Sequence, residues 1–177
     1  MKRSGILILL LLAVVLPISG GRLSLSLDVM ALESCFYDTA LLRTEVAFEL
    51  DEEFSLRVPL SCHWERERGG PFFIEGAICL DYHFFRWPLC VSLSLAQMGV
   101  VGNHPWEEGV CVHFLNEIAL AWDWYVGPAL LVRPAVIIRD PNRLYEAEYE
   151  ELQALFSHYP SLRFSLAVGW VFDLSQS

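Results

Sequence analysis

Twelve ionisable side chains fall at alternate positions within apolar stretches of this sequence, a pattern that could place charges inside a protein. They are Asp28, Arg43, Glu45, Glu49, Arg57, His63, Glu75, Asp81, His113, Glu117, Arg133 and Arg163. Buried charges must pair or change their protonation state, and the planar guanidinium of arginine binds carboxylates with two parallel hydrogen bonds. We therefore expect arginine–carboxylate pairs that plug a polar interior. A narrow ion path or proton route is the alternative interpretation of the same charges.

Enzymatic chemistry is a weaker interpretation of the sequence. A histidine with a serine or an acid can act on lipids, and His104, Glu150, His158 and Ser161 all fall near one end of the strands that are predicted below. No nucleophile, base and orienting group share a tight spacing, which nucleophilic catalysis requires. We predict no catalytic residue, no cofactor and no metal site.

The five cysteines leave at least one thiol without a disulfide partner, because their number is odd. Their spacings do not match a zinc-binding pattern. Cys79 and Cys90 would face each other across one predicted hairpin, so they are the first candidate disulfide. Five buried small apolar side chains are an equally good interpretation.

The elements that must position these groups are strands. In the segment SLRFSLAVGWVF, residues 161–172, every second residue is apolar, which is the period of a strand with one apolar face. Seven earlier segments show a similar alternation. We predict the eight strands at residues 22–32, 40–50, 54–64, 72–82, 87–98, 110–123, 129–138 and 161–172. In the fifth segment, Ala96 is expected on the same face as Cys90.

The longest connection, residues 139–160, is expected to contain one short amphipathic helix. Asp140 followed by Pro141 suits a helix start, and Tyr145, Tyr149 and later apolar residues recur at helical spacing. Glutamates occupy much of the remaining surface of this helix, where solvation is the common explanation for such a run.

The composition excludes some classes of function. Residues 1–21 have a basic start, an apolar run and small residues at Gly20 and Gly21, which is typical of a secretory signal peptide. The formal net charge is −10, and no lysine follows Lys2, so nucleic-acid binding is not expected. Hydrophobic residues make up 54% of the chain, which suits a barrel whose outer surface faces lipid.

The predicted fold is all-β: an eight-stranded antiparallel up-and-down transmembrane barrel over residues 22–172, with a short tail at 173–177. Connections alternate between long and short, as in outer-membrane barrels. Aromatic residues cluster near the strand ends, as expected of girdles at the two membrane interfaces. These are Trp64, Phe72, Trp87, Trp122, Trp124, Trp170 and Phe172, with Phe73 beside the first two.

The chain resembles the small outer-membrane barrels of diderm bacteria, the OmpA/OmpX/OmpW-like group. The segment from Ser165 through Ala167 and Trp170 to Phe172 is similar to the C-terminal signal of such barrels. It departs from that signal because Ala167 replaces the usual glycine and because Asp173 to Ser177 follow the last aromatic residue. The resemblance implies a bacterial outer-membrane location, a lipid bilayer environment and assembly by the outer-membrane insertase. It implies no activity.

We therefore expect an outer-membrane protein with a structural or adhesion-like role, in which the outer loops, chiefly residues 139–160, bind an unidentified extracellular ligand. A narrow pore or transporter is the first alternative. An exported lipocalin-like carrier is the second, and it would place apolar side chains inside and charges outside. The face that carries Arg57, Glu75, Glu117 and Arg163 distinguishes this carrier from the membrane barrel.

Overall fold

The computed structural model describes residues 21–31, 38–65, 69–84, 87–104, 110–156 and 159–174. The predicted signal peptide lies outside these residues except for Gly21. Alternating apolar and polar side chains form strands through most of the described chain, because successive strand side chains point to opposite faces. Among the described residues, no helix has the length and apolar composition that crossing a membrane would require.

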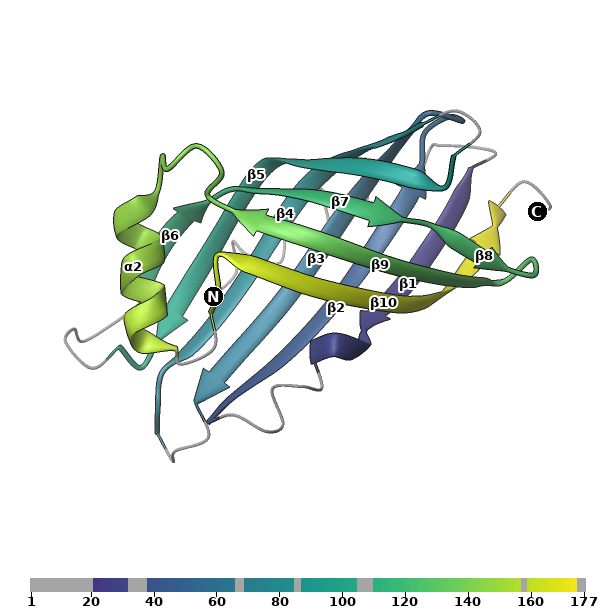
Figure 1. Ribbon diagram of the computed structural model, residues 1–177. Coiled ribbons are helices and arrows are strands. Elements are labelled where there is room, and N and C mark those ends of the chain that lie inside the picture. The colour runs from purple at the N-terminus through teal and green to yellow at the C-terminus, as the bar shows by residue number, and fades with distance from the viewer. Residues whose placement is uncertain are drawn as a thin grey trace.

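The described residues form ten strands and one α-helix (Figure 1). They are β1 (Arg22–Asp28), β2 (Thr39–Glu49), β3 (Phe54–Glu65), β4 (Phe72–His83), β5 (Leu89–Gly102), β6 (Cys111–Leu115), β7 (Glu117–Trp122), β8 (Trp124–Val126), β9 (Leu130–Arg139), α2 (Glu146–Leu155) and β10 (Leu162–Asp173).

The strands form one antiparallel sheet that closes on itself. β1 pairs with both β2 and β10, so that Leu25 lies opposite Val46 on one side and Trp170 on the other. β10 also pairs with β9. β6, β7 and β8 are successive segments of one barrel strand, interrupted at Asn116 and Asp123. The barrel therefore has eight strands, which confirms the predicted eight-stranded antiparallel fold.

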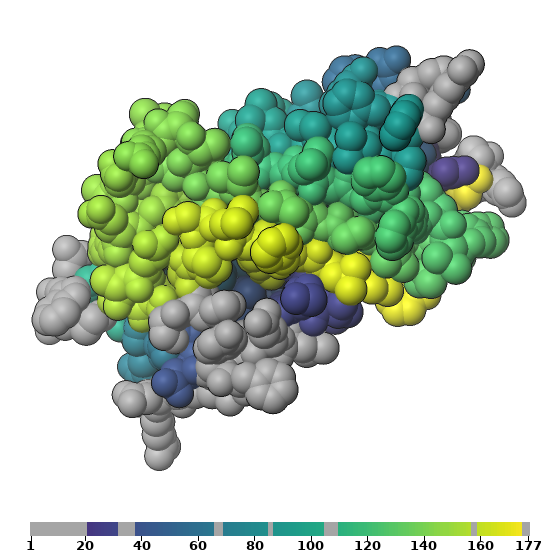
Figure 2. Space-filling view, in the orientation of Figure 1, coloured from purple at the N-terminus to yellow at the C-terminus, as the bar shows by residue number. Residues whose placement is uncertain are grey.

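The two ends of the barrel differ. At one end the strands are joined by the short connections 50–53, 84–88 and 127–129. At the other end, the connection 140–161 carries α2, which lies across the barrel mouth in Figure 1. The space-filling view shows this helix and its flanking segments gathered at that end (Figure 2). We call these the turn end and the helix end.

Strand β5 changes partner along its length. Its first part pairs with β7, and from Gln97 onward it pairs with β6, with the register moving by one residue across 94–96. The β4–β5 pairing also shifts, between Ile78 and Cys79. Such a β-bulge reverses which residues face inward. Ala96 is accordingly exposed and Gln97 buried, so the predicted inward position of Ala96 is wrong.

Strand β1 is shorter than predicted. It ends at Asp28, and Val29 to Ala31 form a 3₁₀ turn. The Asp28 carboxylate accepts a hydrogen bond from the backbone N–H of Met30 (3.0 Å). Such a local bond favours a turn over a continued strand.

The predicted helix is present but starts later than expected. Asp140 has a φ of 46°, which is incompatible with a helical N-cap. Its carboxylate instead accepts the backbone N–H groups of Leu144 (2.8 Å) and Tyr145 (3.2 Å), which stabilises a turn before the helix. The helix itself begins at Glu146.

Helix α2 closes the helix end with a small hydrophobic core. The core consists of Phe73, Val101, Leu115, Tyr149, Leu152, Phe156 and Tyr159. Phe73 therefore points inward and is fully buried, so its predicted place in the outer girdle is wrong. Gly99 makes this position possible, since a Cβ atom there would lie 2.1 Å from Phe73 Cε2.

The candidate Cys79–Cys90 disulfide is wrong. In the β4–β5 register Cys79 lies opposite Ser94, whereas Cys90 lies opposite His83. Both cysteines are buried free thiols on the inner face of the barrel.

Candidate functional site

The barrel interior contains a continuous series of ion pairs between the two ends, which we call the ion-pair chain. In order from the helix end, its members are Glu117, Arg43, Glu45, Arg57, Asp81, Arg133 and Asp123. Acids and arginines alternate strictly along it. Neighbouring charged atoms lie between 2.7 and 3.3 Å apart, and every member is buried. This arrangement satisfies the requirement that buried charges be paired.

Asp81 joins the two halves of the ion-pair chain. Its Oδ2 accepts from Arg57 Nε at 3.0 Å and from an Arg133 terminal nitrogen at 2.7 Å. Arg57 also donates to Glu45 (3.1 Å) and to the Ser92 hydroxyl. One fully buried carboxylate is therefore shared by two guanidiniums, and its removal would leave Arg57 with Glu45 and Arg133 with Asp123 as their acid partners in this chain.

A second polar cluster lies at the helix end, centred on Glu75. Its Oε1 lies 3.2 Å from Arg139 and 3.4 Å from His63 Nε2. Its Oε2 accepts the hydroxyl hydrogen of Tyr159 at 2.8 Å, and the Arg139 guanidinium stacks 3.9 Å from the Tyr159 ring centroid. Burial raises the pKa of the Tyr159 phenol well above its ordinary value. Tyr159 therefore remains a hydrogen-bond donor at neutral pH.

A third pair joins the first and last strands. Arg163 of β10 donates to Asp28 of β1, and Asp28 also accepts the backbone N–H of Leu166 (3.1 Å). Both side chains are buried.

Two other predicted interior residues lie outside these three groups. Glu49 is only half-buried at the turn end, where it accepts a hydrogen bond from the Tyr125 hydroxyl (3.2 Å). His113 is buried at the helix end, 3.9 Å from Glu151.

Four interior groups were not among the predicted interior charges, although the alternation had placed Asp123 on the same face as Glu117. Asp123 and Arg139 continue the inward alternation of their strands, at positions 117, 119, 121, 123 and 133, 135, 137, 139, so extension of the pattern identifies both. Simple alternation along β5 did not place Gln97 inside, because the bulge changes which residues face inward. Tyr159 lies in a connection that has no alternation.

The seven predicted girdle aromatics all lie on outward-facing positions. Trp64 and Phe72 are paired across β3 and β4 near the helix end. The other five lie toward the turn end: Trp87, Trp122, Trp124, Trp170 and Phe172. Trp87 is 66% exposed and Trp170 is 61% exposed.

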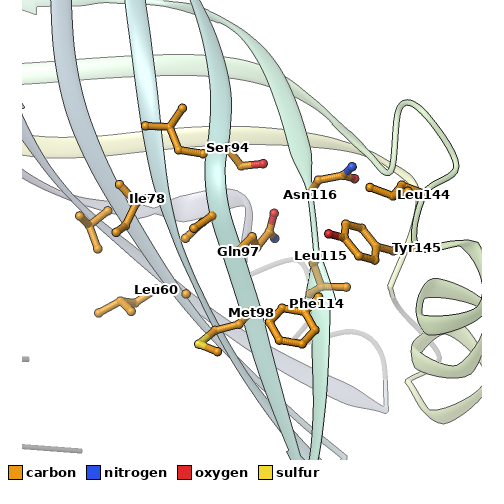
Figure 3. A pocket seen from close by; sticks show the side chains of 15 residues that line it. Leu60, Ile78, Ser94, Gln97, Met98, Phe114, Leu115, Asn116, Leu144 and Tyr145 are labelled. Carbon is orange, nitrogen blue, oxygen red and sulfur yellow. The ribbon is translucent and has the colours of Figure 1, made fainter. Parts of the chain in front are cut away.

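A groove of about 630 Å³ lies where β5 changes partner (Figure 3). It is lined on one side by Leu60 and Ile78 and on the other by Phe114, with Leu144 and Tyr145 at the edge near α2. The Ser94 hydroxyl accepts the backbone N–H of Glu117 at 2.8 Å, which replaces part of the missing strand pairing. The groove is predominantly apolar.

Among the described residues considered for enzymatic chemistry, His104 and Ser161 contact different side chains. His104 Nε2 lies 3.0 Å from Glu151 of α2. Ser161 accepts a hydrogen bond from Gln153 (3.0 Å), and Glu150 is exposed. His158 lies outside the described residues.

Two groups of side chains among the described residues could hold a metal ion. One comprises His83, Cys90 and Asp123 at the turn end, and the other comprises Cys111, His113 and Glu151 at the helix end. Within each group the potential ligand atoms lie within 4.8 Å of one another.

Comparison with known proteins gave no match to a protein-family model or to a curated protein. The N-terminal β-barrel domain of Pseudomonas aeruginosa OprF is similar in structure, with a TM-score of 0.51 and 11% identity over 87% of this chain and 98% of that domain. This chain has the fold of that barrel. Neisserial surface protein A aligns with a TM-score of 0.40 and 8% identity, over 86% of this chain and 93% of the other.

Proposed function

We propose that this protein is an integral outer-membrane barrel with a plugged interior, and that its helix end provides a binding surface. The observation that carries this proposal is the distribution of side chains: charges inside and apolar groups outside. The opposite distribution would be needed by a soluble lipocalin-like carrier, because its outside must contact water.

The outer wall is apolar on every side of the barrel. Large aliphatic or aromatic side chains between 47% and 63% exposed occur on β2, β3, β4, β5, β7 and β10. They are Leu42, Leu60, Ile74, Leu93, Leu120 and Phe164. Water would solvate this surface poorly, whereas acyl chains would solvate it well.

The interior supports a structural plug over a pore. Arg57, Glu75, Glu117 and Arg163 are all buried within the barrel. Two cavities lined by interior residues have volumes of about 10 and 20 Å³, and each has room for about one water molecule. The ion-pair chain lies across the lumen between these small spaces, which favours a plug over an open route for a hydrated ion.

The helix end supports a role in surface binding. Helix α2 buries Tyr149 and Leu152 in the barrel mouth and exposes Glu146 and Glu150. A rigid helix that presents carboxylates at a barrel mouth would suit a basic partner or a cation-bridged surface. The proposed orientation places this end outside the cell and the turn end in the periplasm, with the β10 signal segment recognised by the assembly machinery.

Cell fractionation tests the membrane part of the proposal. The full chain expressed in a diderm bacterium should remain with outer membranes after alkaline extraction. It should also migrate faster on a detergent gel before boiling than after boiling, as a barrel that stays folded does. Recovery as a detergent-independent soluble periplasmic protein would refute the membrane assignment.

Planar-bilayer recording tests the plug separately. We expect purified protein to insert without steady unitary currents, because the ion-pair chain closes the lumen. Reproducible single-channel steps that track protein concentration would instead favour the narrow pore.

A further inference from the structure

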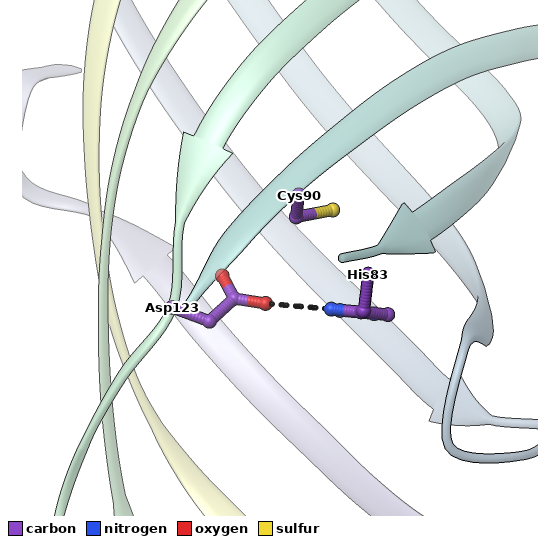
Figure 4. A group of neighbouring side chains, drawn as sticks. All are labelled: His83, Cys90 and Asp123. Carbon is purple, nitrogen blue, oxygen red and sulfur yellow. Dashed lines mark ion pairs between the residues drawn. The ribbon is translucent and has the colours of Figure 1, made fainter. Parts of the chain in front are cut away.

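Three potential metal ligands meet inside the turn end of the barrel (Figure 4). His83 is the last residue of β4, Cys90 lies opposite it in β5, and Asp123 lies between β7 and β8. His83 Nδ1 is 3.4 Å from Asp123 Oδ2, and one ligand atom of each residue lies within 4.8 Å of the others. Cys90 and Asp123 are buried, and His83 is half-buried toward the mouth.

The donor set of one imidazole nitrogen, one sulfur and one carboxylate oxygen suits a borderline divalent ion of the zinc(II) class. Metal bonds of about 2.0–2.3 Å place tetrahedral ligand atoms roughly 3.3–3.8 Å apart. The ligand atoms would therefore need to approach one another by at most about 1–1.5 Å. Catalytic zinc sites commonly use three protein ligands and leave the fourth position to water.

The surroundings of His83 suit a ligand held in place by a second hydrogen bond. The Ser55 hydroxyl lies 2.8 Å from His83 Nε2. A hydroxyl in this position can accept the Nε2 hydrogen, which leaves the Nδ1 lone pair directed at the other two donors. Metal-binding histidines are usually oriented in this way by a partner on the second ring nitrogen.

The charge at this end also favours a cation. The ion-pair chain holds four carboxylates against three guanidiniums, and Asp123 is its terminal acid. Arg133 lies 3.3 Å from Asp123 Oδ1 and donates to Cys90 Sγ at 3.1 Å, but it is shared with Asp81. Asp123 Oδ1 makes no hydrogen bond with any described residue. A divalent ion bound with loss of the Cys90 thiol proton would bring this chain of charges to neutrality.

We propose that His83, Cys90 and Asp123 bind a zinc(II)-class ion at the turn end of the barrel interior. The cavity of about 20 Å³ beside them, lined by Ser55, His83 and Asp123, has room for one water as the fourth ligand. Sequence spacing could not reveal this site, because its ligands come from three different barrel strands.

The same geometry has a competing interpretation as a hydrolase triad, because Ser55, His83 and Asp123 are joined in nucleophile, base and acid order. The cavity size argues against it. A space of about 20 Å³ holds one water but no acyl substrate, and Ser55 is only 3% exposed. An ion with one water fits the available volume, whereas a substrate does not.

Cobalt(II) titration of the metal-stripped full chain in detergent micelles tests the proposal. We expect a thiolate-to-cobalt charge-transfer band that saturates, is displaced by zinc(II) and is absent from C90S. D123N should weaken cobalt binding at least about tenfold, and S55A should weaken it by about 10- to 100-fold through the second shell. C79S is the matched control, since Cys79 is another buried thiol of the same interior and should keep the band.

Three results would overturn the proposal. They are the absence of a band in the folded wild type, a band that survives in C90S but is lost in C111S, and labelling of Ser55 by a fluorophosphonate. Heat-modifiable migration of each variant shows whether it is folded before it is titrated. The titration does not depend on cellular location, so its failure is distinguishable from failure of the membrane assignment.

Discussion

Asp81 shows how much the barrel interior depends on single charges. It is the one carboxylate that compensates both Arg57 and Arg133, and it is fully buried. Buried pairs contribute little net stability relative to an apolar core. Loss of Asp81 nevertheless takes one of two acid partners from each guanidinium and leaves their N–H groups without an acceptor where water cannot replace it.

We therefore predict that D81N lowers the free energy of unfolding by about 1.5–3 kcal/mol, because charge-assisted hydrogen bonds to both guanidiniums are lost. E49Q is the control, because Glu49 is half-exposed at the rim, and its loss should cost less than about 1 kcal/mol. Urea unfolding followed by tryptophan fluorescence in lipid vesicles measures both. Equal losses of unfolding free energy in the two variants would contradict the prediction.

At the residue scale, alternation predicts which side a charge faces but not what it contacts. The parity of positions within a strand identifies Arg57 and Glu117 as inward-facing from sequence alone. Their partners depend on the stagger between strands, which the sequence does not show directly. The Cys79–Cys90 pairing failed for that reason, since the register places each thiol opposite another residue.

At the scale of elements, the main contact is the docking of α2 onto the barrel strand that is interrupted between β6 and β7. Tyr149 donates its hydroxyl hydrogen to the Asn116 carbonyl (2.6 Å) and accepts the Asn116 backbone N–H (3.3 Å). Asn116 is the single residue between β6 and β7. A helix side chain thus satisfies the backbone groups that a neighbouring strand would otherwise satisfy.

We predict that Y149F destabilises docking of α2 by about 1–3 kcal/mol, because the Asn116 N–H loses this acceptor and the Asn116 carbonyl keeps only the Asp140 N–H (3.1 Å). Hydrogen exchange of the amides around Asn116, and proteolysis within residues 140–160, should both accelerate. Y145F is the control, since its hydroxyl makes no hydrogen bond with the residues that the structure describes. Unchanged exchange in Y149F would contradict the prediction.

Alkaline pH gives a second readout of this contact. Burial raises the pKa of the Tyr149 phenol above its ordinary value. The neutral form is therefore favoured in the folded state, and the resulting stability is complete below the ordinary pKa of about 10. It is lost as pH rises from there toward the raised value, and Y149F should lack this component.

Elements with an uninterrupted alternation of apolar and polar residues were predictable from the sequence. Elements whose form depends on contacts with other segments of the chain were not. The alternation in β3 and β10 is uninterrupted, and both strands lie within one residue of their predicted bounds. The bulge in β5 arises from a change of strand partner, and no local residue preference marks it. The start of α2 was misplaced because Asp140 suits a turn as well as it suits a helix cap.

On the scale of the whole molecule, an apolar exterior around a charged interior argues for insertion in a bilayer. The sequence alone indicated this arrangement, since side-chain parity and strand count fix a closed barrel once one face is assigned to lipid. It could not indicate which interior groups meet at the barrel ends, where turns, bulges and α2 decide the contacts.

We predict that a charge on the outer wall destabilises the inserted barrel in a depth-dependent way. L93R, at mid-strand on the exposed face of β5, should cost about 2–4 kcal/mol. V126R, at the turn end of β8, should cost about 0–1 kcal/mol, because an arginine near the interface reaches water. Refolding equilibria in vesicles measure both, and similar costs at the two positions would argue against a spanning orientation.

The change of partner by β5 also has a mechanical consequence. The first and last strands, β1 and β10, are joined in unbroken register from Arg22 to Asp28, but across residues 94–96 the wall is held partly by a serine hydroxyl and by a tyrosine from α2. Under lateral tension the cylinder should tear first along this line rather than where its first and last strands meet. Release of the helix would then weaken the wall as well as uncover the mouth.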